Sequence, residues 1–482
     1  MCAVVLLDRL GQVFAQALVK LGEFMSLHTL LAQHAEASGP IKVGVIGAGK
    51  FASMFLTQAL NLTGIHVVGI ADLAPDRARA ALARTGWPEE RYAAASFDEA
   101  LKTGGTHVTD SADKLIGSPS IEVIVEVTGN PIAGAYHAVR SIEAGCHVIM
   151  VNVEADCLIG PVLAARAHRA GVVYAMAYGD QPALICELVD WCRTVGFDVV
   201  AAGKGTKYLP EYHASTPETV WSYYGFTEEQ LASGDFNPKM FNSFLDGTKS
   251  AIEMAAVANG TGLIPQDEGL FFPPCGVDEL PIIYRPVSEG GVLTRKGTVE
   301  IASSLKRNGV PVSRDLRWGV YVTFEARTDY AMQCFAEYGV KTDPSGRYAS
   351  LYRPYHLIGL ELAVSIASAV VRGEPTGVPS GFRGDVMSVA KRALTAGEML
   401  DGEGGYMVYG RLAPAEIAVA QRSLPIGLAN GFRLRNDVPV GAVVRWDDVD
   451  VDESVLAVQL RRELEQAMPP VNQSSRAAGK HV

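Results

Sequence analysis

The fold of the first part of the chain is decided by the stretch Ile41-Lys-Val-Gly-Val-Ile-Gly-Ala-Gly-Lys-Phe-Ala52. Its first half is an apolar run typical of a buried strand, and its second half is the pattern G-x-G-x-x-A. A helical pattern follows from Phe51 to Leu60, and a second apolar run, from His66 to Ala71, ends at Asp72. This order predicts a strand, a glycine turn, a helix and a second, parallel strand.

Each residue of the glycine pattern has a physical role in holding a dinucleotide. Gly47 allows the tight turn, Gly49 lets the backbone approach a pyrophosphate, and Ala52 lets the helix pack closely on the strand. The phosphates would lie against exposed amides at the positive end of the helix, and Asp72 is placed to bind a ribose hydroxyl. The motif therefore predicts a bound nicotinamide dinucleotide. We expect the coenzyme to contact Gly47, Ala48, Gly49, Lys50, Phe51, Asp72, Arg77, Thr128, Gly129 and Asn152.

The sequence leaves the choice between NAD(H) and NADP(H) open. The carboxylate of Asp72 favours NAD(H), because it repels a 2′-phosphate. Arg77 and Arg79 follow closely and could hold that phosphate, or they could be solvated charges on the next helix. The segment Val127-Thr-Gly-Asn-Pro131 closes a later strand and is expected to form a wall of the nicotinamide site, because ligands bind at strand carboxyl ends in such sheets.

Composition excludes several other classes of protein. The chain has 42 basic and 53 acidic residues and a net charge of −11, which argues against nucleic acid and anionic membrane surfaces as partners. The apolar run Ala3–Leu7 is interrupted by Asp8, so it is too short for a signal peptide or a membrane span. Seven scattered cysteines without a C-x-x-C pair predict reduced thiols and a cytoplasmic location.

The 482 residues exceed what one hydrophobic core usually serves, so several domains are expected. We predict an α/β fold that begins with a Rossmann doubly wound parallel sheet, because apolar strand runs alternate with helical patterns. A mixed α+β catalytic and dimerisation domain and a small C-terminal β domain follow. The expected boundaries are a helical extension at 1–40, the Rossmann domain at 41–178, the catalytic domain at 179–375 with 353–372 returning to the Rossmann domain, the small domain at 376–468 and a disordered tail at 469–482.

Three further elements are expected from local patterns. Alternating apolar residues predict a strand from Gly319 to Ala326. Helical spacing predicts one long helix from His356 to Val371 and a final helix from Arg461 to Met468.

Several segments resemble a known group of enzymes. The Rossmann half, with Val127-Thr-Gly and Val151-Asn152, resembles the homoserine dehydrogenase-like oxidoreductases. The chain is more similar to one offshoot, the DXR-like (DRL) reductoisomerases, over roughly residues 25–465. The supporting segments are Val151-Asn-Val-Glu-Ala-Asp156, Tyr178-Gly-Asp-Gln-Pro182, Gly203-Lys-Gly-Thr-Lys-Tyr-Leu-Pro210, Phe244-Leu-Asp-Gly-Thr-Lys249 and Tyr352-Arg-Pro-Tyr-His356.

The resemblance implies a function and an assembly. DRL enzymes convert 1-deoxy-D-xylulose 5-phosphate to 2-C-methyl-D-erythritol 4-phosphate, an isoprenoid precursor, with NADPH, and carry a C-terminal SAF domain. A SAF-like domain is therefore expected at 376–468, and a homodimer as the assembly. One departure puts plain homoserine dehydrogenase chemistry in doubt: Val153 follows Asn152, where homoserine dehydrogenases usually carry a lysine after the matching strand.

The reductoisomerase reaction needs a phosphate anchor, a divalent metal, a proton-transfer group and a hydride donor. Lys204 and Lys207 bracket two small residues and could anchor a phosphate with help from backbone amides, or they could be solvent-exposed. Arg353 is expected to be a further phosphate ligand. The carboxylates expected to bind Mg²⁺ or Mn²⁺ are Glu154, Asp156 and Asp180, unless the first two only cap a helix.

Two more groups are candidates for proton transfer. Asp246 and Lys249 lie three positions apart at a helix start, so both could share one face, with Asp246 tuning Lys249 as an acid or phosphate ligand. Homoserine dehydrogenase-like enzymes use an Asp/Lys pair in a comparable region. His356 could hold a phosphate or shuttle a proton, or could simply be satisfied at a helix start. The predicted catalytic set is Lys204, Lys207, Asp246, Lys249 and His356.

The leading hypothesis is an NAD(P)H-dependent oxidoreductase that acts on a small phosphorylated ketose or polyol, with DXP reductoisomerase activity as the best-defined candidate. One alternative is a homoserine dehydrogenase-like or sugar-acid dehydrogenase without rearrangement. The other is a nucleotide-binding sensor that uses the SAF domain to contact a partner.

Overall fold

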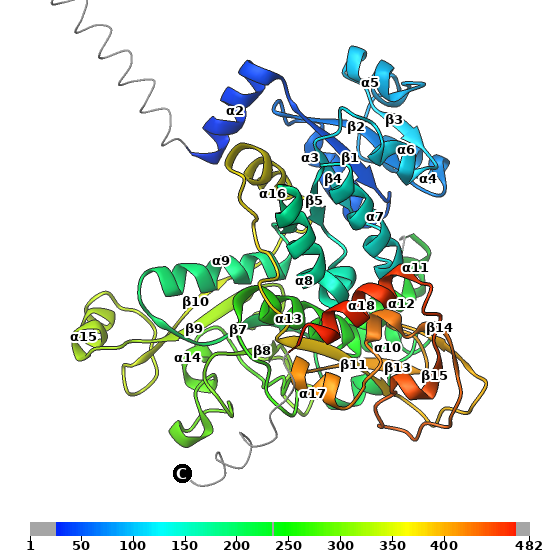
Figure 1. The fold of residues 1–482 in the computed structure, drawn as a ribbon. Coiled ribbons are helices and arrows are strands. Elements are labelled where there is room, and N and C mark those ends of the chain that lie inside the picture. The colour runs from blue at the N-terminus through cyan, green and yellow to red at the C-terminus, as the bar shows by residue number, and fades with distance from the viewer. Residues whose placement is uncertain (1–25, 234–235, 469–482) are drawn as a thin grey trace, which may run out of the picture.

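The computed structural model describes residues 26–233 and 236–468 (Figure 1). The Rossmann sheet lies at the top of Figure 1, the second sheet at the lower left and the C-terminal domain at the lower right, with helices α8 and α13 between them. Most of the predicted N-terminal extension, and all of the predicted disordered tail, lie outside the described residues. The described part of the extension is helix α2 (Leu27–Ser38).

The first domain is a six-stranded parallel sheet with the order β3-β2-β1-β4-β5-β6. Its order reverses at β1 and β4, which is the switch point of a doubly wound sheet. The predicted Rossmann fold is therefore confirmed. Strand β3 has three residues and was not among the predicted strands, because so short a run carries little periodicity. The strands are β1 (Ile41–Ile46), β2 (Ile65–Ala71), β3 (His107–Thr109), β4 (Val123–Glu126), β5 (His147–Met150) and β6 (Tyr174–Met176).

Helices cover both faces of this sheet, and their apolar sides complete its core. The strand residues on both faces are almost all buried, as expected for a parallel sheet between helix layers. The helices are α3 (Lys50–Ala59), α4 (Pro75–Arg84), α5 (Phe97–Thr103), α6 (Ala112–Ile116), α7 (Pro131–Glu143) and α8 (Val153–Ala170).

The second domain contains a four-stranded mixed sheet with the order β10-β9-β7-β8. Only β7 and β8 run parallel, and the other pairs are antiparallel. Strand β9 confirms the strand predicted at 319–326. The strands are β7 (Asp198–Thr206), β8 (Thr298–Ser303), β9 (Val320–Glu325) and β10 (Tyr348–Arg353), and the main helices are α9 (Gln181–Thr194), α10 (Val220–Tyr224), α11 (Glu228–Ser233), α12 (Pro238–Leu245), α13 (Thr248–Thr261), α14 (Leu280–Ile283) and α15 (Asp329–Glu337).

The long helix predicted from 356 to 371 is wrong over its first half. Residues 357–362 form turns, and the helix α16 (Ala363–Ala367) continues into a π-helix, Ser368–Arg372. Gly359 has φ +77°, and a Cβ atom there would lie 2.7 Å from the Phe51 carbonyl oxygen, so the chain is bent tightly against α3. Beyond this bend, Leu362 and Ile366 pack into the core of the Rossmann domain.

The C-terminal domain consists of short antiparallel strands and two helices. Strands β11 and β13 form one sheet, and β12, β14 and β15 form another. Helix α18 begins before the predicted final helix and packs on α7 and α8, while β11 and β13 pack on α13. The elements are β11 (Gly384–Ala390), β12 (Met399–Asp401), β13 (Val408–Pro414), α17 (Ala415–Ala420), β14 (Asn430–Leu434), β15 (Val449–Asp450) and α18 (Leu456–Gln466).

Within the described residues, every helix is too short or too polar to cross a membrane. The six cysteines in this part of the chain are free thiols, as predicted.

Candidate active site

The glycine turn between β1 and α3 leaves room for the phosphates of a dinucleotide. Gly47 has φ +107°, and a Cβ atom there would lie 3.0 Å from the Val127 carbonyl oxygen, so the turn requires glycine. Gly49 caps helix α3 without a side-chain hydrogen bond, and a Cβ atom on Gly49 would meet open space. The uncapped amides at the positive end of α3 fit a pyrophosphate.

Asp72 is fixed by hydrogen bonds at the end of β2. Its carboxylate accepts the N–H groups of Ala48 (2.8 Å) and Ala74 (2.9 Å), and both of its oxygens accept from the Arg77 guanidinium (2.8 Å). Arg77 remains largely exposed and offsets the negative charge of Asp72. Arg79 instead forms an exposed pair with Asp76, so Arg77 is the better placed of the two arginines to meet a 2′-phosphate.

The structure brings the predicted nicotinamide wall together at the ends of β4 and β5. Asn152 caps helix α8, and its side-chain amide donates to Thr128 Oγ1 (3.3 Å) and the Asn130 carbonyl (2.9 Å). Thr128 in turn donates to Glu126 Oε1 (2.6 Å). Asn152 therefore holds the turn around Gly129, which has φ +67°.

Two buried ion pairs lie side by side where the first two domains meet. Lys204, on β7, pairs with Glu253 on α13, and Lys249, one helical turn before Glu253, pairs with Glu154 in the first turn of α8. All four side chains are at most 12% exposed. Asp180 caps helix α9 and lies within electrostatic range of both lysines and of Glu253. We call Lys204, Lys249, Glu154, Glu253 and Asp180 the lysine cluster.

The cluster shifts the protonation of its members. Burial, reinforced by the charge of Glu253, raises the pKa of Asp180 to about 7 despite the opposing charges of Lys249 and Lys204. Burial alone would lower the pKa of Lys249, but the nearby carboxylates, Glu154 first, raise it above its ordinary value. At neutral pH the site thus contains a lysine that stays charged and a carboxyl group that is partly protonated.

His356 approaches this cluster from the segment after β10, and Arg353 is the last residue of that strand. The His356 Nδ1–H donates to the Trp318 carbonyl oxygen (2.8 Å), which leaves Nε2 free to accept a proton. Burial lowers the pKa of His356, so the ring is neutral at neutral pH, and the charges of Lys204 and Glu253 act on it. Arg353 pairs with Glu361, so its charge is already partly neutralised by a carboxylate.

The three carboxylates predicted to bind Mg²⁺ or Mn²⁺ have other partners in the structure. Glu154 pairs with Lys249, Asp156 accepts from the Tyr174 hydroxyl (2.8 Å), and Asp180 caps α9. In the parts of the chain that the structure describes, no three carboxylate, imidazole or thiol groups lie close enough together to hold a metal ion. A lysine, a tyrosine and a helix end thus each take one oxygen of these carboxylates, and in the described residues Asp156 Oδ2 has no hydrogen-bond partner.

The segment from Gly203 to Lys207, where backbone amides were expected to help the two lysines hold a phosphate, is mostly strand β7. The Gly205 N–H donates to the Gly319 carbonyl (3.0 Å), and a Cβ atom on Gly205 would lie 1.9 Å from the Leu316 carbonyl oxygen. Gly205 therefore allows the close packing of this strand, and its amide is already hydrogen-bonded. Lys204 and Lys207 do not act as one clamp: Lys207 donates to the Tyr223 carbonyl, away from the pair formed by Lys204.

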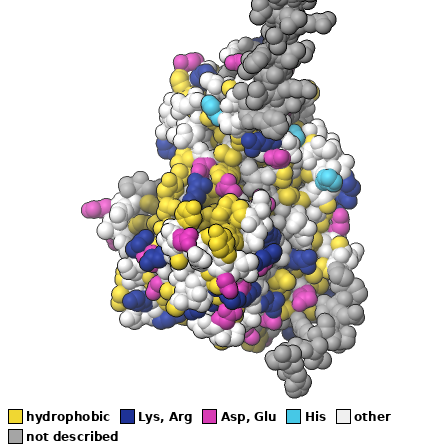
Figure 2. All heavy atoms as spheres, turned by 90° about the vertical axis from the view of Figure 1, so that its left-hand side faces the viewer, with side chains coloured by type: hydrophobic (Ala, Val, Ile, Leu, Met, Phe, Trp, Pro, Cys, Tyr) yellow, Lys and Arg dark blue, Asp and Glu magenta, His cyan; other side chains and the backbone are white. Residues whose placement is uncertain are grey.

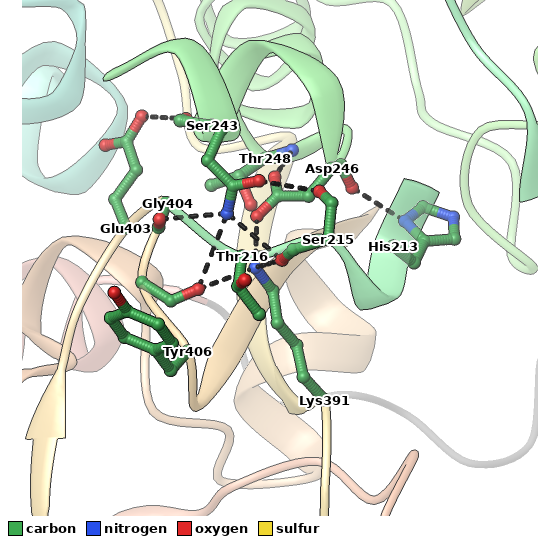
Figure 3. Close-up of polar contacts among 12 residues, drawn as sticks. His213, Ser215, Thr216, Ser243, Asp246, Thr248, Lys391, Glu403, Gly404 and Tyr406 are labelled. Atoms are coloured by element: carbon green, nitrogen blue, oxygen red, sulfur yellow. Dashed lines mark hydrogen bonds and ion pairs between the residues drawn. The ribbon is translucent and has the colours of Figure 1, made fainter. Parts of the chain in front are cut away.

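Asp246 was expected to adjust the acidity of Lys249, but the two side chains do not form an ion pair with each other. Its Oδ1 accepts the Thr248 N–H (2.9 Å), and its Oδ2 pairs with Lys391 Nζ (2.7 Å) from the C-terminal domain. Figure 3 shows Lys391 reaching this corner next to Ser215 and the Gly404 segment. Both side chains of the pair are at most 2% exposed, so the pair joins two domains inside the molecule.

Sequence reasoning missed three residues of the site. Glu253 could have been found, because it lies four positions after Lys249 on a predicted helix and must share its face. Lys391 and Glu403, from the C-terminal domain, carried no such signal, since only the packing of that domain brings them to α12 and α13.

Comparison with protein families agrees with this geometry. Residues 179–362 match a family model described as "Oxidoreductase DRL, catalytic domain", and residues 41–150 match one described as "Oxidoreductase family, NAD-binding Rossmann fold". The chain is an NAD(P)-dependent oxidoreductase. A comparison with curated protein sequences finds no match.

Solved structures of dehydrogenases resemble the fold at low identity. A homoserine dehydrogenase from Thiobacillus denitrificans is 15% identical over 74% of this chain and 83% of its own, with a TM-score of 0.40. A myo-inositol dehydrogenase from Lactobacillus casei, in complex with NAD(H) and myo-inositol, is 17% identical over 38% of this chain and 50% of its own, with a TM-score of 0.26. The match thus spans about half the length of the latter structure.

Proposed function

We propose that this oxidoreductase reduces the carbonyl group of a small polyhydroxylated, phosphorylated ketose, with 1-deoxy-D-xylulose 5-phosphate as the best-defined candidate and an isoprenoid precursor as the product. The observation that carries the proposal is the lysine cluster, which lies where the carboxyl edge of the Rossmann sheet meets the second sheet. The match of residues 179–362 to the DRL catalytic domain supports the choice of substrate.

The residues of the cluster suit a carbonyl reduction. NAD(P)H, when bound, supplies the hydride. The Lys249 ammonium stays charged and would stabilise the oxygen as it gains negative charge. Asp180, with a pKa of about 7, can give the oxygen its proton at neutral pH. The Lys204 ammonium, held by Glu253, offers a second positive charge for an anionic substrate.

The same residues support a second candidate, a dehydrogenase that acts without rearrangement on a sugar acid or a homoserine-like alcohol. The rearrangement of a reductoisomerase calls for a chelated metal, and the carboxylates that were expected to provide it are bound to lysine, tyrosine and a helix end. A lysine and an aspartic acid suffice for the simple oxidoreduction.

The test follows NADPH and NADH absorbance with 1-deoxy-D-xylulose 5-phosphate, with and without Mg²⁺ or Mn²⁺, and runs homoserine with NAD(P)⁺ in parallel. Reductant loss that depends on the ketose phosphate supports the proposal, whereas a flat trace with both reductants removes this substrate. Alcohol oxidation alone supports the second candidate.

Replacing Lys249 tests the cluster directly. We expect Lys249→Met to lower kcat by about 100-fold or more, because one stabilising charge on the developing oxyanion is lost. Affinity for NAD(P)H should not change, since the coenzyme phosphates are expected at α3. The exposed Lys102 gives the matched control, Lys102→Met. Equal kcat values for the two variants would remove Lys249 from the mechanism.

We further propose that the protein is a homodimer. Figure 2 shows hydrophobic side chains gathered on the face where α15 and β10 lie. Strand β10 lies at one edge of the second sheet, where Ala349 forms an isolated bridge to Thr342, and the rest of this edge can pair with another copy. The exposed apolar residues of this face are Trp191, Val195, Tyr330, Tyr338, Leu351 and Tyr352.

A further inference from the structure

A loop of the C-terminal domain, residues 401–406, is locked onto helix α12 of the second domain. Lys239 Nζ donates to the Asp401 carbonyl (2.8 Å), and the Asn242 side-chain amide donates to the Gly404 carbonyl (2.9 Å). Gly404 has φ +65°, and a Cβ atom there would lie 2.0 Å from the Lys239 carbonyl oxygen. Lys391 Nζ also donates to the Gly405 carbonyl (2.8 Å). The loop therefore has one well-defined position.

In this position of the loop, Glu403 lies on the side that faces the lysine cluster. Its carboxyl group accepts a hydrogen bond from the Ser243 hydroxyl of α12 (Figure 3). The charged groups that act on it are Lys249 of α13, Glu154 of α8, and Asp246, which is paired with Lys391. Glu403 is partly exposed, so a proton from solvent can reach it.

The lysine cluster together with Glu403 contains more negative than positive charges when every group is ionised. Lys204 and Lys249 are matched by Glu253 and Glu154, and within the described residues Asp180 and Glu403 form no ion pair. Burial raises the pKa of Glu403 to about 8, with the charge of Glu154 adding to the effect. Two carboxyl groups thus hold protons near neutral pH, one from the Rossmann side and one from the C-terminal domain.

We propose that the C-terminal domain completes the active site, with Glu403 as a positioning residue that resupplies the cluster with a proton after each turnover. The inference rests on the proposed function. In that reaction the carbonyl carbon gains a hydride from NAD(P)H, its oxygen gains a proton from the cluster, and NAD(P)⁺ and the alcohol leave. Glu403 then returns a proton to the cluster and takes one from solvent.

The test compares Glu403→Gln and Glu403→Asp in the full chain with Glu398→Gln, a partly exposed glutamate of the same domain that pairs with Arg392. We expect kcat of the wild-type chain to fall as pH rises through about 8, and we expect Glu403→Gln to remove this fall and to lower kcat about 10-fold at pH 7. KM for NAD(P)H should be unchanged, and Glu403→Asp should restore part of the pH dependence. A pH profile of Glu403→Gln that coincides with that of Glu398→Gln would overturn the proposal.

A second measurement needs no turnover. In ¹³C spectra of the full chain labelled at glutamate carboxyl groups, one resonance should titrate near pH 8 and be missing from Glu403→Gln. Lys249→Met should move this midpoint up and Glu154→Gln should move it down, because the two charges act in opposite directions. If Glu403→Gln does not fold, Ser243→Ala should move the midpoint up, since the hydrogen bond stabilises the carboxylate.

These results separate the two claims. A midpoint at the ordinary glutamate value, or one that Lys249→Met leaves unchanged, removes Glu403 from the cluster. If the titration is observed and no ketose or alcohol is turned over, the proposed function is wrong and the placement of Glu403 beside Lys249 stands.

Discussion

The protonation state of a single carboxyl group in this protein depends on its burial and on the charged groups around it. Asp180 and Asp156 both follow strand ends of the same sheet, and both have a pKa of about 7 because burial disfavours the charged form. Asp156 is bonded to Tyr174 inside the Rossmann domain, whereas Asp180 faces the two lysines. We therefore expect Asp180, which faces the lysines, to be the group that exchanges a proton with a substrate.

Asp180→Asn should change the pH dependence of both stability and rate. The pKa of Asp180 is raised in the folded chain from 3.8 to about 7, so its contribution to stability is present in full below about 3.8 and is lost as pH rises through about 7. The wild-type melting temperature should therefore fall relative to that of Asp180→Asn between pH 4 and 7. The fall in kcat near pH 7 should vanish as well. Thermal unfolding and rate profiles check this, with the exposed Asp110→Asn as control; parallel melting curves would contradict it.

At the scale of elements, two glycines decide how β7 lies in its sheet. A Cβ atom on Gly203 would lie 1.7 Å from the Glu300 carbonyl oxygen, and one on Gly205 would lie 1.9 Å from that of Leu316. The backbones on both sides are therefore closer than any other residue would permit. This close approach sets the position of Lys204, which lies between the two glycines on the strand.

We expect Gly205→Ala to destabilise the chain by about 2 kcal/mol or more, because the added methyl group must push backbone aside. The pair of Lys204 with Glu253 should also be disturbed, so kcat should fall. Urea unfolding gives the free energy of unfolding. Gly381→Ala is the matched control, since a Cβ atom there meets only the end of the Arg383 side chain at 3.7 Å. Equal stabilities of the two variants would show that the strand can shift.

The whole molecule is held together by buried charges between its domains. Lys391 of the C-terminal domain donates three hydrogen bonds, to the carbonyls of Ser215 and Gly405 and to the carboxylate of Asp246. Arg461 pairs with Asp385 and crosses to the Leu158 carbonyl of α8. Such fully bonded pairs fix one arrangement of the domains more than they add stability.

Lys391→Met should cost about 3–5 kcal/mol of unfolding free energy, because the Asp246 carboxylate is left buried without its partner. The double variant Asp246→Asn with Lys391→Met should recover part of that loss. Urea unfolding measures both, and the exposed Lys306→Met serves as control. If Lys391→Met matched Lys306→Met, the domain contact would not depend on the pair.

The apolar face around β10 leads to an expectation for assembly. Light scattering after size exclusion should give the mass of two chains. Leu351→Glu should give that of one, because a carboxylate at the interface is not solvated. Val440→Glu, at an exposed apolar position in the C-terminal domain, should leave the mass of two chains unchanged. A single-chain mass for the unaltered protein would remove the homodimer.

Local pattern alone determined the Rossmann domain. The glycine turn, the apolar runs and Asp72 act through neighbours along the chain or on the next strand, and a period of two or 3.6 reveals them. Helix and strand boundaries were predicted well where a run was long and uninterrupted. They failed at 356–362, where Gly359 bends the chain against α3.

Only the tertiary structure decided the site. Lys249 meets Glu154 across 95 residues, and Lys391 meets Asp246 across 145. No periodicity connects positions so far apart. The partner of a buried charged residue depends on which opposite charge the tertiary packing brings next to it. The predicted metal ligands Glu154, Asp156 and Asp180 and the predicted phosphate ligands Lys204 and Lys207 therefore have partners that the sequence did not predict. Interactions between residues close in sequence thus determine the coenzyme-binding fold. Ion pairs between residues far apart in sequence determine the arrangement of the candidate active site.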